Sequence, residues 1–155
     1  MDDTDRALIA ALRRDARSTW AELGRTVGLS GPSVTERVSR LERAGVITGY
    51  HAAVDPAALG RSVAALVGIH LSDTSDQDAV EIELSRLEEI EDCWFVAGDE
   101  SFTIKVRVPD VIALETTLSR LRRIQGIAYT RTTVVLSTKW EGRVAGVMVE
   151  RPTAG

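Results

Sequence analysis

The hydrophobic pattern of the chain changes its period near residue 50, and this change limits the folds that the sequence can adopt. Before residue 50, apolar residues recur at helical spacing. After residue 61, apolar runs and alternating segments typical of strands are interleaved with helical ones. For the 155 residues we expect a helical domain over 1–50, a linker over 51–61, an α+β domain over 62–140 and a tail over 141–155.

The first 50 residues predict three helices whose ends are marked by capping residues. Asp3 or Thr4 is placed to begin the first helix, because a short polar side chain can accept a hydrogen bond from a free backbone N–H. Thr19 and Glu22 have the spacing of a capping box at the start of the second helix, and Gly28 ends it.

The third predicted helix begins after Ser30 and has two different faces. Val34, Val38 and Leu41 form an apolar face, and the rest is hydroxyl-bearing and charged. Two helices joined by a tight glycine-containing turn indicate a helix-turn-helix, whose second helix would enter the major groove of double-stranded DNA. Serine and threonine can reach phosphates or bases, and arginine can make a bidentate contact to guanine. The predicted DNA-binding residues are Ser30, Ser33, Thr35, Glu36, Arg37 and Arg40.

The charge distribution permits DNA binding without demanding it. The net charge is −4, but residues 1–50 hold eight arginines against seven acidic residues, whereas residues 51–155 carry a net charge of −5. The alternative interpretation of the third helix is an ordinary amphipathic helix with a solvated charged face. The turn at Gly28–Leu29–Ser30, preceded by a capped helix, favours DNA binding over that alternative.

The second part of the chain predicts the order β-α-β-β-α-β, which is the ferredoxin-like pattern. Two helices can cover only one face of such a sheet, so we expect a partner subunit to cover the other and the protein to be at least a homodimer. The predicted strands are 62–71, 92–98, 101–108 and 127–138, and the predicted helices are 76–90 and the segment that follows Asp110.

The chain resembles the Lrp/AsnC (feast/famine) transcription regulators in the segments DRALIAALRRDAR, GLSGPSVTERVSRLERAGVITGY, RLEEI, VAGDESFTIKVRVPD and TRTTVVLST. These segments occur in the family's order over nearly the whole chain. The resemblance implies a winged helix-turn-helix followed by a ferredoxin-like effector-binding domain. It also implies dimers that often assemble further, to octamers, and amino acids as effectors.

The resemblance also implies an effector site between dimers, formed by the loop after the second strand of the sheet and by the end of the last strand. There a carboxylate such as Asp99 could accept hydrogen bonds from the ligand's ammonium group, while backbone N–H and hydroxyl groups could bind its carboxylate. The alternative is that the loop is merely a polar hairpin turn. The predicted effector-binding residues are Gly98, Asp99, Glu100, Ser101, Phe102, Leu136, Ser137 and Thr138.

This loop departs from the family pattern, which commonly reads Gly-Asp-aromatic-Asp-aromatic. Glu100 replaces the first aromatic residue, and Ser101 replaces the second acidic one. If Asp99 binds the ligand's ammonium group, Glu100 is free to pair with a second cation, which favours a basic effector such as lysine or arginine. The alternative is that Glu100 points to solvent and selects nothing.

Other classes of function find little support in the sequence. Cys93 is the only cysteine, which excludes an internal disulfide and fits a reducing cytoplasm, and no apolar run is long enough to cross a membrane. His51, His70 and Cys93 lack metal-ligand spacing, and we expect His70 to be packed or at an interface. No cofactor-binding or catalytic motif occurs.

Three classes of function therefore compete: an amino-acid-responsive regulator, an effector-independent architectural DNA-binding protein of the same fold, and a small ferredoxin-like enzyme. The missing catalytic constellation argues against the enzyme, and the first class is favoured. The first two differ in whether an amino acid changes DNA affinity or assembly.

Overall fold

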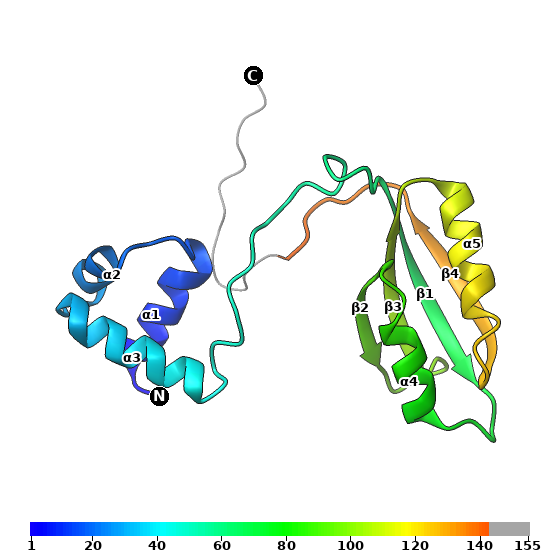
Figure 1. The fold of residues 1–155 in the computed structure, drawn as a ribbon, viewed down its shortest axis with the longest axis horizontal. Helices are drawn as coiled ribbons and strands as arrows, with labels where there is room; N and C mark the ends of the chain where they lie inside the picture. Colours follow the sequence, from blue (N-terminus) through cyan, green and yellow to red (C-terminus); the bar gives the residue numbers. More distant parts are fainter. Residues whose placement is uncertain (143–155) are drawn as a thin grey trace. The chain divides into compact units, whose positions relative to one another are not determined.

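The computed structural model describes residues 1–142, which form two compact units, one containing Met1–Ala53 and the other Val54–Lys139 (Figure 1). Almost all of the predicted tail, residues 143–155, lies outside the described part. The first unit contains α1 (Asp3–Arg14), α2 (Trp20–Val27) and α3 (Gly31–Arg43). Its core is formed by buried side chains from all three helices, which are Leu8, Leu12, Leu23, Val34 and Val38.

The first helix begins one or two residues earlier than the sequence suggests. Asp2, rather than Asp3 or Thr4, is the N-cap, and its carboxylate accepts a hydrogen bond from the backbone N–H of Asp5 at 2.8 Å. The carboxylate of Asp5 accepts in return from the backbone N–H of Asp2 at 3.0 Å. The prediction of Asp3 or Thr4 was wrong because only Asp2 has an acidic residue three positions later that can close a capping box.

The predicted helix-turn-helix connection is confirmed. Thr19 and Glu22 form the capping box of α2. Gly28 follows that helix with φ +71°, a left-handed conformation that is unfavourable for residues with a Cβ. Ser30 then caps α3 by accepting from the backbone N–H of Ser33. A three-residue turn therefore connects α2 to α3.

The α+β class with an N-terminal helix-turn-helix is confirmed, but the wing is not formed. Among residues 44–62, all of which the structure describes, there is no strand; the backbone makes turns, including one over 56–60. The wing implied by the resemblance is therefore absent from residues 1–62, where the described chain contains helices and turns but no strand.

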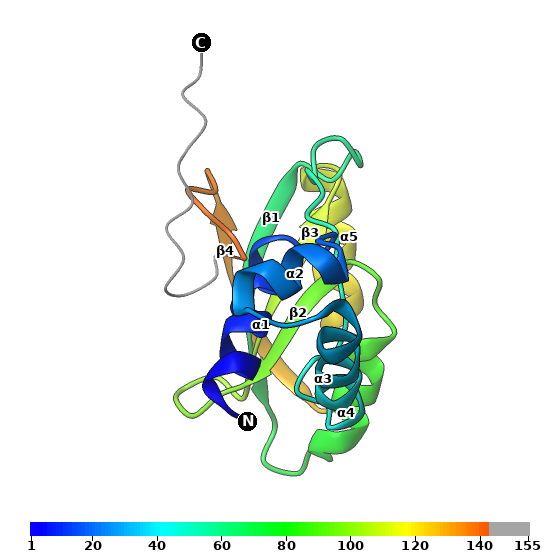
Figure 2. The ribbon, with the colours of Figure 1, turned by 90° about the vertical axis from the view of Figure 1, so that its left-hand side faces the viewer.

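The second unit is a four-stranded antiparallel sheet in the order β2-β3-β1-β4, with α4 and α5 on one side (Figures 1 and 2). This is the predicted ferredoxin-like arrangement. Its elements are β1 (Val63–Leu71), α4 (Gln77–Ser85), β2 (Ile90–Phe95), β3 (Phe102–Val108), α5 (Val111–Leu121) and β4 (Ile127–Val135).

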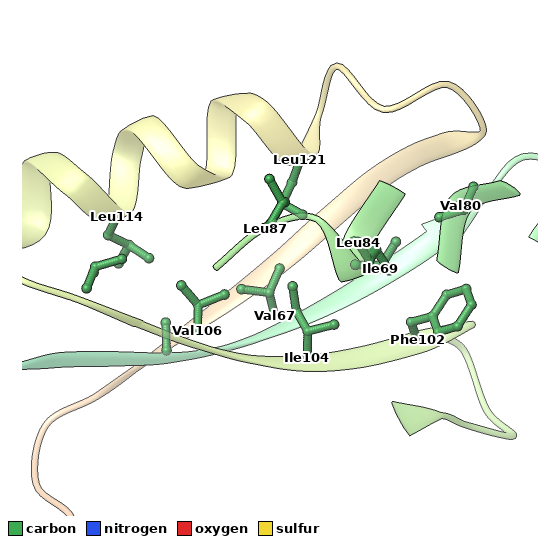
Figure 3. Packing of buried hydrophobic residues seen from close by; sticks show 12 residues of the cluster. Val67, Ile69, Val80, Leu84, Leu87, Phe102, Ile104, Val106, Leu114 and Leu121 are labelled. Atoms are coloured by element: carbon green, nitrogen blue, oxygen red, sulfur yellow. The ribbon is translucent and has the colours of Figure 1, made fainter. Parts of the chain in front are cut away.

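One face of each central strand forms the core beneath the helices. Figure 3 shows Leu114 and Leu121 of α5 directed at Val67 of β1 and at Ile104 and Val106 of β3, and all five are buried. In the predicted strand 101–108, the alternating residues Phe102, Ile104, Val106 and Val108 form this buried face.

The opposite face of this sheet is open in the described residues of the unit and carries apolar side chains. Leu66, Trp94 and Tyr129 lie there with exposed fractions of 41, 47 and 52 %. Their register places them on this face, since Leu66 pairs with Lys105, Trp94 with Thr103 and Tyr129 with His70, away from the core positions. We call this surface the open face.

Candidate DNA-binding surface and candidate effector site

The N-terminal turn of α3 presents hydroxyl groups at the surface. The hydroxyl oxygens of Ser30 and Ser33 are 2.9 Å apart, and the hydroxyl of Thr35 donates to the carbonyl of Gly31 at 3.1 Å. Glu36 is exposed. The structure thus brings four of the predicted DNA-binding residues together at one end of the helix, although their binding to DNA stays a prediction.

Arg37 and Arg40 are held by acidic residues of α1. The guanidinium of Arg37 donates to Asp2 at 2.7 Å and to Asp5 at 2.8 Å, and its side chain is only 28 % exposed. Arg40 donates to both carboxylate oxygens of Asp5 at 3.1 Å. Both predicted DNA-binding arginines are therefore already paired within the protein, and their contact with DNA stays a prediction. These contacts join residues more than 30 positions apart, so helical spacing could not reveal them.

Both carboxylates of this cluster are stabilised in their charged form. The hydrogen bond from Arg37, followed by that from the backbone of Asp5, lowers the pKa of Asp2 to about 2. The pKa of Asp5 is also lowered, first by the backbone N–H of Asp2 and then by Arg37. The ion pairs between α1 and α3 therefore persist at neutral pH.

Sequence reasoning omitted Arg43, which the structure places at the exposed end of α3. It lies three positions after Arg40 and seven after Glu36, so these three residues share one helical face. The Nε–H of Arg43 donates to the carbonyl of Ser39 at 3.2 Å. Continuing the i, i+4, i+7 pattern from Glu36 would have found it.

The predicted effector loop contains one residue whose side chain is unavailable to a ligand. Phe102 is 1 % exposed, lies in the core and makes an edge-on contact with Phe95 at 5.3 Å between ring centroids. Only its backbone could contact an effector. Gly98 and Asp99 are exposed, whereas the backbone N–H of Ser101 donates to Ile69 at 2.8 Å.

Glu100 folds over the open face instead of pointing to solvent. Its Oε1 accepts from Arg131 at 3.2 Å. Its Cγ occupies the space above Gly68, where an added Cβ would lie 2.6 Å away. Glu100 is therefore partly covered, because the missing side chain at Gly68 leaves room for it, and its role in selecting an effector stays a prediction. Gly68 in the middle of a strand was the sequence signal for this close approach.

The two halves of the predicted effector site lie at opposite ends of β1 within one protomer. Phe102, at the end of the loop, pairs with Ile69. Val135, just before the predicted residues 136–138, pairs with Ala64. These two positions are five residue steps apart along β1, a distance of about 17 Å. One protomer therefore does not bring Asp99 and the segment Leu136–Thr138 together.

His70 is packed, as predicted. It is 6 % exposed and stacks on Tyr129 with ring centroids 3.8 Å apart. Within residues 1–142 no cluster of histidine, cysteine and acidic side chains is arranged to hold a metal ion. In the same residues, no helix has the length and apolar character needed to cross a membrane.

The fold and these surfaces define a class of protein: regulators in which a helix-turn-helix domain precedes a ligand-binding domain. The AsnC-type helix-turn-helix domain matches residues 1–42, and the Lrp/AsnC ligand binding domain matches residues 64–145. The chain belongs to the Lrp/AsnC family of transcriptional regulators.

Individual relatives agree with this assignment. The HTH-type transcriptional regulator LrpA of Mycobacterium tuberculosis is 41 % identical over 143 residues, which are 92 % of this chain and 95 % of that protein. The leucine-responsive regulatory protein of Escherichia coli K12 is 39 % identical over 141 residues, covering 88 and 85 %. A feast or famine regulatory protein from M. tuberculosis, solved with L-methionine, superimposes with a TM-score of 0.87 at 41 % identity, covering 92 and 97 % of the two chains.

Proposed function

We propose that this protein binds specific sequences of double-stranded DNA as a homodimer and that an amino acid changes its DNA affinity or its assembly. The structure of α3 is the main support for the proposal that the protein binds DNA. This helix is capped at Ser30, anchored on α1 and α2 by buried apolar residues, and exposes a polar face that includes Glu36 and Arg40. A helix of this kind fits the major groove.

The effector site is shared between copies of the chain. This follows from the separation of about 17 Å along β1, because the loop at Asp99 and the segment Leu136–Thr138 can meet only if different protomers supply them. Asp99 binds the ammonium group of the effector, and the hydroxyls of Ser137 and Thr138 bind its carboxylate. The relative solved with L-methionine supports an α-amino acid as the ligand.

The side chain of the effector is neutral. A lysine or arginine ligand would have to displace Arg131 from Glu100, whereas a neutral ligand leaves this ion pair intact. The pairing thus favours a neutral amino acid over the basic one that the sequence pattern alone favours.

The open face joins two protomers in the dimer. Its apolar side chains and the buried Nε2 of His70, which has no hydrogen-bond partner within the described residues, would then be covered or paired by a second copy. Dimers assemble further, such as to an octamer, because the family resemblance places the effector site between dimers.

A thermal-shift screen of the twenty amino acids tests the effector. A ligand at a hundredfold excess over its Kd raises stability by about 2.7 kcal/mol. We expect a neutral amino acid to raise the melting temperature of the parent but not of Asp99→Asn. If no amino acid shifts the parent, the effector-independent architectural alternative replaces this proposal.

A further inference from the structure

The carboxylate of Asp5 is buried between α1 and α3 and connects the two helices. Its side chain is 2 % exposed and accepts hydrogen bonds from Arg37 at 2.8 Å, from Arg40 at 3.1 Å and from the backbone of Asp2 at 3.0 Å. A buried carboxylate needs such partners to remain charged. Both arginines therefore converge on one fixed point of α1.

The ion pairs add a directional constraint on α3 to the packing of its apolar face. Val34, Val38 and Leu41 are buried and resist displacement, but the hydrophobic effect itself has no direction. Charge-assisted hydrogen bonds to two carboxylate oxygens fix an orientation. Rotation of α3 by about 20° would move groups at its surface, at a radius of roughly 5–6 Å, by about 2 Å. That displacement is enough to break a hydrogen bond to a base edge.

We propose that Asp5 is a positioning residue for DNA recognition: through Arg37 and Arg40 it sets the rotation of α3 about its axis. This inference rests on the proposed DNA-binding function. Asp5 also offsets part of the positive charge of two arginines. Removing its charge therefore weakens sequence discrimination while leaving attraction to phosphates unchanged or stronger.

The variant Asp5→Asn tests this, because it keeps the shape of the side chain and removes the charge. Fluorescence anisotropy is measured on a duplex selected in vitro with the parent and on a scrambled duplex of the same composition. We expect the affinity of Asp5→Asn for the selected duplex to fall at least about tenfold, which corresponds to the loss of roughly one base contact. Its affinity for the scrambled duplex should not fall. Asp3→Asn is the matched control, because Asp3 lies in the same turn and its ion pair joins only exposed Arg6, at 2.7 Å.

The outcomes are distinct, provided that circular dichroism shows folded protein at the assay temperature. Unchanged affinities, an equal fall on both duplexes, or stronger binding to the selected duplex would each overturn the positioning role. A parent that prefers no duplex rejects the proposed function itself.

Arg37→Gln provides a second test of the proposal if Asp5→Asn does not fold. For Arg37→Gln we expect weaker discrimination with an unchanged salt dependence on the scrambled duplex, since Arg37 acts through α1. A salt slope smaller by about one would show that Arg37 contacts a phosphate directly and would contradict the proposal.

Discussion

Truncation of one side chain on the open face should weaken the dimer measurably. Leu66 is 41 % exposed in the single chain. Full burial of a leucine side chain contributes about 1.5–3 kcal/mol, so burial of this fraction contributes about 0.6–1.2 kcal/mol per protomer. Two protomers contribute together, and alanine retains part of the contact. We therefore expect Leu66→Ala to weaken dimerisation by about 1–2 kcal/mol, or roughly 5- to 30-fold in Kd.

Sedimentation equilibrium over nanomolar to micromolar concentrations measures this constant. Ile82→Ala is the matched control, because Ile82 is 53 % exposed but lies on α4, on the other side of the sheet. The control should dimerise like the parent. If Leu66→Ala also dimerises like the parent, or if the parent is a monomer at micromolar concentration, the open face is not the dimer interface.

Three further predictions concern single positions. Gly24→Ala should lower the free energy of unfolding of the helical unit by about 1–3 kcal/mol, because the alanine Cβ would lie 2.4 Å from the backbone carbonyl oxygen of Leu29. An unchanged midpoint of urea unfolding would contradict this close approach. Asp2→Asn should lower the melting temperature at pH 7, where the ion pair with Arg37 is formed. Because the pKa of Asp2 is depressed to about 2, the difference in melting temperature between parent and variant should persist above pH 4 and vanish as the pH falls through 2. In calorimetric titrations, both the parent and Glu100→Gln should bind neutral amino acids better than lysine or arginine. If the parent instead prefers a basic amino acid and Glu100→Gln loses that preference, Glu100 selects the effector.

Local signals in the sequence predicted most of the fold. The capping box at Thr19 and the turn at Gly28 depend only on residues within four positions, so their chemistry is visible in the sequence. The alternation from Phe102 to Val108 likewise follows from strand geometry. Ferredoxin-like order then follows from the order of the elements.

The candidate sites depend on contacts between distant residues, which helical spacing and strand alternation do not reveal. The pairing of Arg37 with Asp5 joins two helices, and the position of Glu100 above Gly68 joins a loop to a neighbouring strand. Each changes the role assigned to a charged side chain, because a charge that seems free in the sequence is already paired in the fold. The separation of the effector loop from residues 136–138 also depends on register, which periodicity alone does not give.

The most direct test of the central claim is the affinity of the full chain for its selected duplex, measured by fluorescence anisotropy at fixed salt with and without each amino acid. We predict that the selected duplex binds at least about a thousandfold more tightly than a scrambled one, as specific DNA-binding proteins do. We also expect at least one neutral amino acid to change the affinity or the stoichiometry. Equal affinity for both duplexes would contradict the claim of sequence-specific binding. If no amino acid alters binding to the selected duplex, the claim of an effector is contradicted.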